Sequence, residues 1–245
     1  MREPARKSET VFALTGIGTY LAGTSAAGIL DRAAGMPRLF SALFHSGMAV
    51  LLLLWIRRNG MTERYGLIPP RCRPSRVLFY LPLILTAACQ AAFGRVPRIS
   101  PGEAACFTVS MVSVGFLEET LFRGFLFRAL ETRYEKQGIL LSAAAFSLCH
   151  LVNLMNGQSP ADTALQMVFA FFAGLALALL FERGKSLIPC IAFHGMLNVL
   201  SLFSPEGAQT RAPEGPGSAA LIRFGISVLL MAGYAAWLWK HLKEK

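Results

Sequence analysis

The chain alternates between long apolar runs and short polar segments. A helix that spans a bilayer needs about 20 mostly apolar residues. Eight runs reach or approach that length: residues 11–30, 39–56, 77–93, 104–126, 139–154, 163–181, 187–203 and 219–239. The third, fifth and seventh are short, and none alternates in the way of a barrel strand. Because lipid-exposed backbone must satisfy its own hydrogen bonds, the runs predict helices. The predicted fold class is all-α, a polytopic transmembrane helix bundle of about eight spanning helices, with residues 1–245 as a single integral membrane domain.

Composition agrees with this prediction, and the basic residues orient the helices. The chain is 54% hydrophobic and 16% charged, whereas a soluble domain carries about a quarter charged residues. The net charge of +10 comes from Lys and Arg that lie mostly in short segments between apolar runs. With the N-terminus inside, 17 of the 24 basic residues fall on the cytoplasmic side. This distribution predicts that both termini are cytoplasmic and argues against nucleic acid as a partner.

The cysteines do not predict a metal cage or a disulfide framework. The five cysteines include no C-x-x-C pair and mostly lie in apolar stretches. We interpret them as small packing residues.

Two adjacent glutamates, Glu118 and Glu119, interrupt the fourth apolar run. Charged side chains are costly inside a membrane and usually mark a functional centre. On an α-helix each residue turns about 100°, so Glu119 and Arg123 share one face and Glu118 points elsewhere. A buried Glu–Arg pair that only fixes helix packing would leave the second glutamate unexplained. We therefore expect Arg123 to neutralise Glu119, and Glu118 to serve as a base.

Two later apolar runs carry polar side chains at the same spacing. Phe146 and His150 share one helix face, and so do His194 and Asn198. A lone histidine in a membrane segment is usually a packing residue, and we interpret His45 in this way. Two histidines, an asparagine and a double glutamate on three helices instead predict a shared, buried polar active-site cluster.

The chain lacks the motifs of several other hydrolases. No H-E-x-x-H motif surrounds a histidine, no G-x-S-x-G elbow occurs, and the two aspartates are not placed as a catalytic dyad. Cys149 beside His150 does not predict a Cys–His pair, because sequence neighbours point about 100° apart on a helix.

Taken in order, the three motifs resemble those of the CPBP family. These are the CAAX proteases and bacteriocin-processing enzymes, relatives of the type II CAAX prenyl endopeptidase that are often called Abi-type membrane proteins. The motifs are Glu118-Glu119-x-x-x-Arg123, Phe146-x-x-x-His150 and His194-x-x-x-Asn198, present without departure. The family-like catalytic core covers about residues 104–203.

The resemblance implies a metal-independent intramembrane glutamic endopeptidase, reached from the cytoplasmic side, with a membrane-associated peptide or protein as its substrate. By position, Glu118 and His150 would activate a water molecule, with no cofactor required. His194 and Asn198 would donate hydrogen bonds to the oxyanion of the tetrahedral intermediate. The positions that would hold the site together are Glu119, Arg123 and Phe146.

Other interpretations stay open at this stage. The same glutamates and histidines are a legitimate ligand set for zinc. The polar centre would otherwise bind a partner helix, as in scaffold or bacteriocin-immunity members of the family, or relay protons in a transporter. A relay needs titratable groups leading outward, and the sequence shows one cluster with little leading outward. The sequence does not distinguish a prenylated C-terminus, a leader peptide and a bacteriocin precursor as substrate. The compact length and short extramembrane segments favour a protein of the bacterial plasma membrane.

Overall fold

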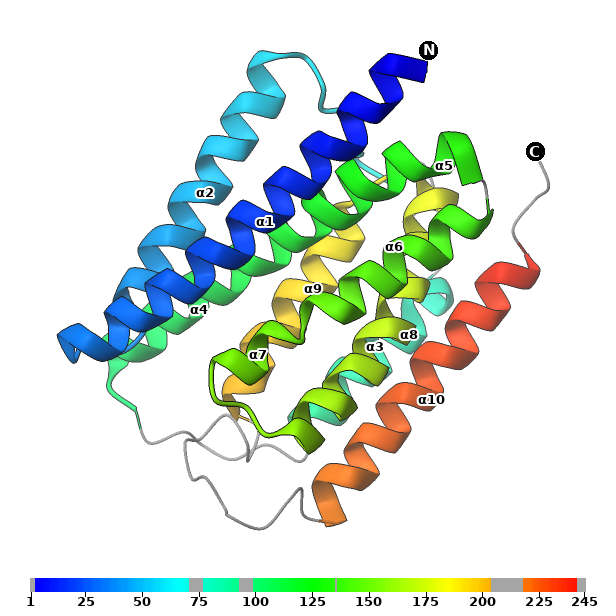
Figure 1. Ribbon diagram of the computed structural model, residues 1–245. Helices are drawn as coiled ribbons and strands as arrows, with labels where there is room; N and C mark the ends of the chain where they lie inside the picture. Colours follow the sequence, from blue (N-terminus) through cyan, green and yellow to red (C-terminus); the bar gives the residue numbers. More distant parts are fainter. Residues whose placement is uncertain (1–2, 71–76, 93–98, 135, 204–217, 242–245) are drawn as a thin grey trace.

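The computed structural model describes residues 3–70, 77–92, 99–134, 136–203 and 218–241, and every regular element within them is a helix (Figure 1). The elements are α1 (Glu3–Ala34), α2 (Leu39–Arg58), α3 (Val77–Ala92), α4 (Pro101–Glu118), a π-helical segment (Glu119–Phe127), α5 (Arg128–Tyr134), α6 (Lys136–Cys149), α7 (Val152–Met155), α8 (Pro160–Gly184), α9 (Ile188–Leu200), a 3₁₀ turn (Ser201–Phe203) and α10 (Ser218–Lys240). The predicted all-α fold class is confirmed.

Six of the described helices are long and apolar enough to cross a membrane: Glu9–Ala34, Leu39–Arg58, Pro101–Glu131, Lys136–Met155, Pro160–Gly184 and Ala220–Lys240. Two further apolar helices, Tyr80–Ala91 and Ile188–Phe203, are shorter. These eight correspond in order to the eight predicted runs, so the prediction of about eight helices is confirmed by count, and six of the described helices reach spanning length. Many large apolar side chains remain exposed on the bundle, as the surface of an integral membrane protein requires.

Two of the long helices begin with the same local sequence. Ser100 and Ser159 each precede a proline, and each side chain accepts a hydrogen bond from the backbone N–H three residues on. Proline suits the first helical turn because its missing N–H is not needed there. These caps therefore set where α4 and α8 start.

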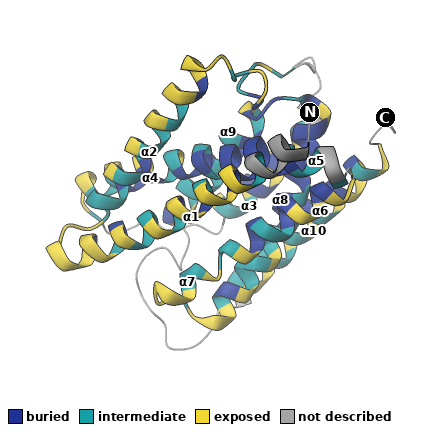
Figure 2. Cartoon of the chain, turned by 45° about the horizontal axis from the view of Figure 1, so that its top comes forward, coloured by how far each residue is buried: buried dark blue, intermediate teal, exposed yellow. Residues whose placement is uncertain are grey.

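The helix that carries the two glutamates lies at the centre of the bundle. α4, the π-helical segment and α5 follow one another without a break. α2 and α9 pack on α4, while α1 and α6 pack on the π-helical segment. All nine residues of that segment are buried, as the dark blue of Figure 2 illustrates for the bundle centre.

A second apolar core surrounds α8, which packs between α6 and α10. α3 contacts both α10 and α9 and completes this side of the bundle. α1 begins and α10 ends at the same end of the molecule (Figure 1). This arrangement fits the predicted placement of both termini on one side of the membrane, although it does not identify that side.

Candidate active site

Glu119 and Arg123 form a fully buried ion pair. Arg123 Nη1 lies 2.9 Å from Glu119 Oε1, and both side chains have zero exposure. The guanidinium also lies over the Phe146 ring, 4.3 Å from its centroid, which adds a cation–π contact. Space for it comes from Gly174 on α8, where an added Cβ would lie 3.2 Å from Arg123 Nη2. The pair therefore closes the inner wall of the cluster.

The hydrogen-bonding pattern of the helix changes between the two glutamates. Glu118 is the last residue of α4, and Glu119 is the first of the π-helical segment. A π-helix uses i→i+5 hydrogen bonds, is rare, and is often found at functional sites. The uniform 100° turn assumed from the sequence therefore does not hold past Glu118.

His194 on α9 bridges the two glutamates. Its Nδ1 lies 2.7 Å from Glu119 Oε1, and its Nε2 lies 3.3 Å from Glu118 Oε2. The Glu118 and His194 side chains are 14% and 12% exposed, whereas Glu119 has no exposure. The two carboxylates thus converge on one imidazole, but only Glu118 is accessible to a reactant.

Two glycines allow α9 to approach α4 this closely. A Cβ added to Gly115 would lie 2.6 Å from the backbone nitrogen of Gly195 and 3.3 Å from the carbonyl carbon of His194. The helix backbones are therefore in direct contact at this level, which places His194 next to the glutamates.

Phe146 joins the second histidine to the cluster. Its ring packs edge-on against His150 at 5.1 Å and against His194 at 5.7 Å between centroids. His150 Nδ1 lies 3.0 Å from the Phe146 carbonyl oxygen, and the matching N–H donation assigns the Nδ1 proton and leaves Nε2 as an acceptor. Asn198 is partly buried, and its side-chain amide forms no hydrogen bond with a described residue.

One polar contact of the site was not predicted from the sequence. The Tyr20 hydroxyl, on α1, donates a hydrogen bond of 2.6 Å to Glu118 Oε1. No spacing rule connects residues 98 positions apart, so the only signal was a phenol within an apolar run.

The acidic and imidazole groups are engaged mainly with one another. Among the described residues, no group of three or more His, Cys, Asp or Glu side chains is arranged to hold a metal ion. In the cluster itself, Glu119 is bound by Arg123 and His194, and Glu118 by Tyr20 and His194.

The helices and the cluster together define a polytopic membrane protein with a carboxylate–imidazole centre buried inside its bundle. Residues 100–200 match the protein family described as type II CAAX prenyl endopeptidase Rce1-like. The matched segment runs from the start of α4 to the end of α9 and contains all three motifs, so the match supports the resemblance to the CPBP family of CAAX proteases. No curated protein matches the chain. The family is one of intramembrane proteases, and it supports a membrane-associated substrate.

Proposed function

We propose that this protein is a metal-independent glutamic endopeptidase that hydrolyses peptide bonds of membrane-associated substrates. The observation that carries the proposal is the unequal burial of the two glutamates. Glu119 is sealed against Arg123, whereas Glu118 keeps an exposed fraction and faces His194. A sealed carboxylate holds structure, and an accessible one can take a proton from water.

Glu118 would act as the general base with help from His150. A base must lie within hydrogen-bond reach of the water that it deprotonates, and Glu118 is the accessible carboxylate of the cluster. The bond from His150 to the Phe146 carbonyl leaves Nε2 as the free acceptor. Water held between this nitrogen and the Glu118 carboxylate would be polarised from both sides.

His194 and Asn198 would stabilise the oxyanion that forms on the scissile carbonyl. Glu119 holds one nitrogen of His194, which fixes the direction of the other. In the resting structure that nitrogen faces Glu118 at 3.3 Å. Donation from both nitrogens to the two carboxylates requires the imidazolium form of His194, and in that form a substrate carbonyl would compete with Glu118 for the Nε2–H. Asn198 lies one turn further along α9 with an uncommitted amide, so it can donate without breaking a bond. Preorganised donors of this kind are worth about 10²–10³ in rate each.

The substrate would approach from the cytoplasmic side of a bacterial plasma membrane. This part of the proposal rests on the basic residues of the sequence and on the family resemblance. Leader peptides and bacteriocin precursors are the substrate classes that suit such a setting, and a prenylated C-terminus suits it less.

The test is cleavage of a library of membrane-anchored peptides by purified protein in liposomes. Glu118→Gln keeps the shape of the side chain and removes the base, and we expect a loss of about 10²–10⁴ in rate. Glu103→Gln is the matched control, because Glu103 lies on the same helix and pairs with Arg38 away from the cluster. Full activity of Glu118→Gln would contradict the proposal. So would a folded wild-type protein that cleaves no peptide, a result that favours a scaffold.

A further inference from the structure

Tyr20 connects the first helix of the chain to the proposed base. The ring is 4% exposed, and its hydroxyl donates to Glu118 Oε1 while His194 faces Glu118 Oε2. The Glu118 carboxylate is therefore held from two opposite helices, α1 and α9. The family match begins at residue 100, so α1 contributes to the cluster from outside the matched segment.

Tyr20 also packs against a hydrogen-bonded chain of polar side chains. Its ring lies 5.9 Å from the ring of His45 on α2, measured between centroids. The Thr24 hydroxyl lies 3.0 Å from His45 Nε2, and His45 Nδ1 lies 2.7 Å from Ser110 Oγ. The interpretation of His45 as a packing residue without polar company is thus wrong. Ser110 lies on α4, which packs against α2, so the sequence around His45 gave no sign of this partner.

The carboxylate fixes the direction of the bond from Tyr20. An ionised Glu118 only accepts, so the Tyr20 proton points at it. His45 is bound to Thr24 through one ring nitrogen and to Ser110 through the other. These two bonds hold the ring that packs against Tyr20.

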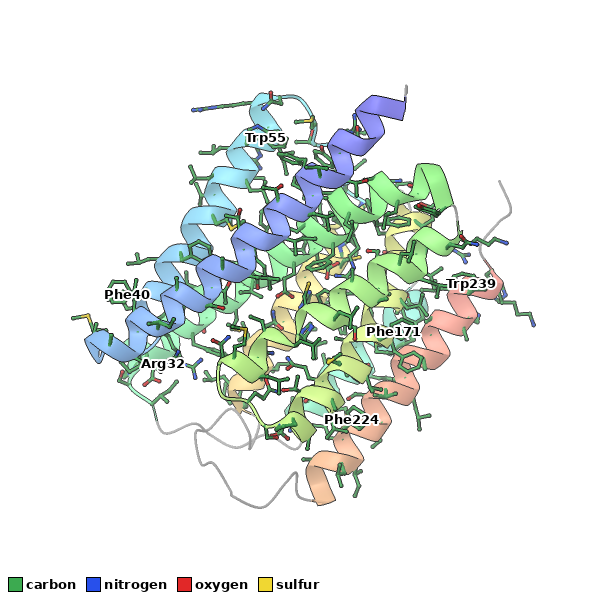
Figure 3. All side chains as sticks on the ribbon, in the orientation of Figure 1. Arg32, Phe40, Trp55, Phe171, Phe224 and Trp239 are labelled. Carbon is green, nitrogen blue, oxygen red and sulfur yellow. The ribbon has the colours of Figure 1, made fainter. Side chains whose placement is uncertain are left out.

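The far end of the chain borders a cavity. The cavity has a volume of about 190 Å³ and lies between α1, α2 and α4. Its polar lining includes Thr24, His45 and Ser110, together with Arg32 and Arg38. Figure 3 places Arg32 at the end of the bundle opposite the chain termini. Polar groups therefore do lead outward from the cluster, which the sequence did not indicate.

We propose that Tyr20 is a positioning residue for Glu118, and that Thr24, His45 and Ser110 hold Tyr20 in place. This inference rests on the proposed function. Without the phenol hydroxyl, Glu118 Oε1 loses its hydrogen bond from α1, and the carboxylate turns toward His194. A closer Glu118–His194 pair withdraws the base from water and blocks the nitrogen that would bind the oxyanion.

Tyr20→Phe tests the inference, since it removes one hydroxyl and keeps the ring. A hydrogen bond to a charged group corresponds to a loss of about 10- to 100-fold, which we expect in kcat with KM within about twofold. Tyr234→Phe is the matched control because Tyr234, on α10, is also 4% exposed. Both variants should melt within a few degrees of wild type. The inference would be overturned if Tyr20→Phe kept full activity, or if Tyr234→Phe lost as much activity as Tyr20→Phe.

Ser110→Ala separates positioning from general damage. Ser110 binds His45, and in this proposal it acts on Glu118 through the His45 ring and Tyr20. We expect it to lower kcat about threefold, because an ordinary hydrogen bond contributes about 1 kcal/mol or less after exchange with water. In the Tyr20→Phe background it should have no further effect, because the link is already broken. If the losses in kcat of the two single variants multiply in the double variant, Ser110 does not act through Tyr20, and this part of the inference is overturned.

The outcomes distinguish this inference from the proposed function. If wild type cleaves and Tyr20→Phe cleaves equally well, the inference fails and the proposed function stands. If wild type cleaves nothing, the proposed function fails. Infrared difference spectra then test whether the Tyr20 hydroxyl is bonded to the Glu118 carboxylate. A carboxylate band that shifts when Tyr20→Phe is introduced into wild type, but not when it is introduced into Glu118→Gln, supports a hydrogen bond from Tyr20 to Glu118. The absence of any such shift overturns it.

Discussion

Gly115 and Gly195 bring the backbones of α4 and α9 into contact. A Cβ on Gly115 would meet the Gly195 nitrogen at 2.6 Å and its Cα at 2.7 Å. Both neighbours are backbone atoms, which cannot turn aside as the tip of a side chain can. His194 directly precedes Gly195, so the distance between the helices also sets the distance between His194 and the glutamates.

Gly115→Ala is therefore expected to push α9 away from α4. We expect a cost of about 1–3 kcal/mol in stability from overpacking and a loss of about 10² in activity from misplacing His194. Melting temperature and peptide cleavage in detergent or liposomes would measure both. Gly233→Ala on α10 is the control, because an added Cβ there meets nothing within 4 Å. Wild-type activity in Gly115→Ala would show that the close approach does not position His194.

Arg123→Gln is expected to destabilise the whole bundle. Removing one partner of a buried ion pair leaves an uncompensated charge and costs about 3–5 kcal/mol. Arg57→Gln, at an exposed position at the end of α2, should change stability little. The measurement is the melting temperature of each purified variant.

Removing both charges separates stability from activity at the same site. The double variant Glu119→Gln with Arg123→Met should regain much of the stability, because a neutral pair needs no compensation. It should stay inactive, because His194 loses the carboxylate that orients it. A double variant that regains activity as well would contradict the positioning role of Glu119.

Asn198→Ala is expected to lower kcat by about 10²–10³ without lowering stability. The amide forms no hydrogen bond with a described residue in the resting state, so truncation leaves no buried partner behind. Steady-state kinetics and thermal melting on the same preparation would test this. Asn59→Ala, at the end of α2 and bonded to a backbone carbonyl there, is the control for loss of an asparagine. A drop in melting temperature equal to the drop in activity would point to a structural role.

Cleavage is expected to survive a strong zinc chelator. Arg123 offsets the charge of Glu119, and Tyr20 and His194 contact Glu118, so these side chains hold the two carboxylates without a cation. The measurement is the cleavage rate before and after chelation, with a thermolysin-type zinc protease treated in parallel to show that the chelator works. Loss of activity that returns on addition of Zn²⁺ would instead establish a zinc enzyme.

Much of this fold was predictable because a membrane reduces the choices. Each predicted apolar run coincides with an apolar helix, since backbone in lipid has little alternative to a helix. The predicted contact between Glu119 and Arg123 is present, although the segment that carries them is π-helical and not the α-helix that the prediction assumed. The shared polar centre followed from the cost of placing Glu, His and Asn in such helices.

The rest depends on contacts between helices that no single run encodes. His194 contacts both glutamates because Gly115 lets α9 approach, and a single glycine in an apolar run gives no such signal. Tyr20 joins the site because α1 packs against the π-helical segment. The hydrogen bonds of His45 depend on α1 and α4, so its own helix carried no trace of them.

The π-helical segment gives one continuous helix two different helical repeats. Side chains before Glu119 follow the α-helical repeat, and those from Glu119 to Phe127 follow a wider one. Because a π-helical turn closes over one residue more than an α-helical turn, each residue in this segment turns through a smaller angle. The direction of the Arg123 side chain is therefore set by the type of helix as well as by its spacing from Glu119.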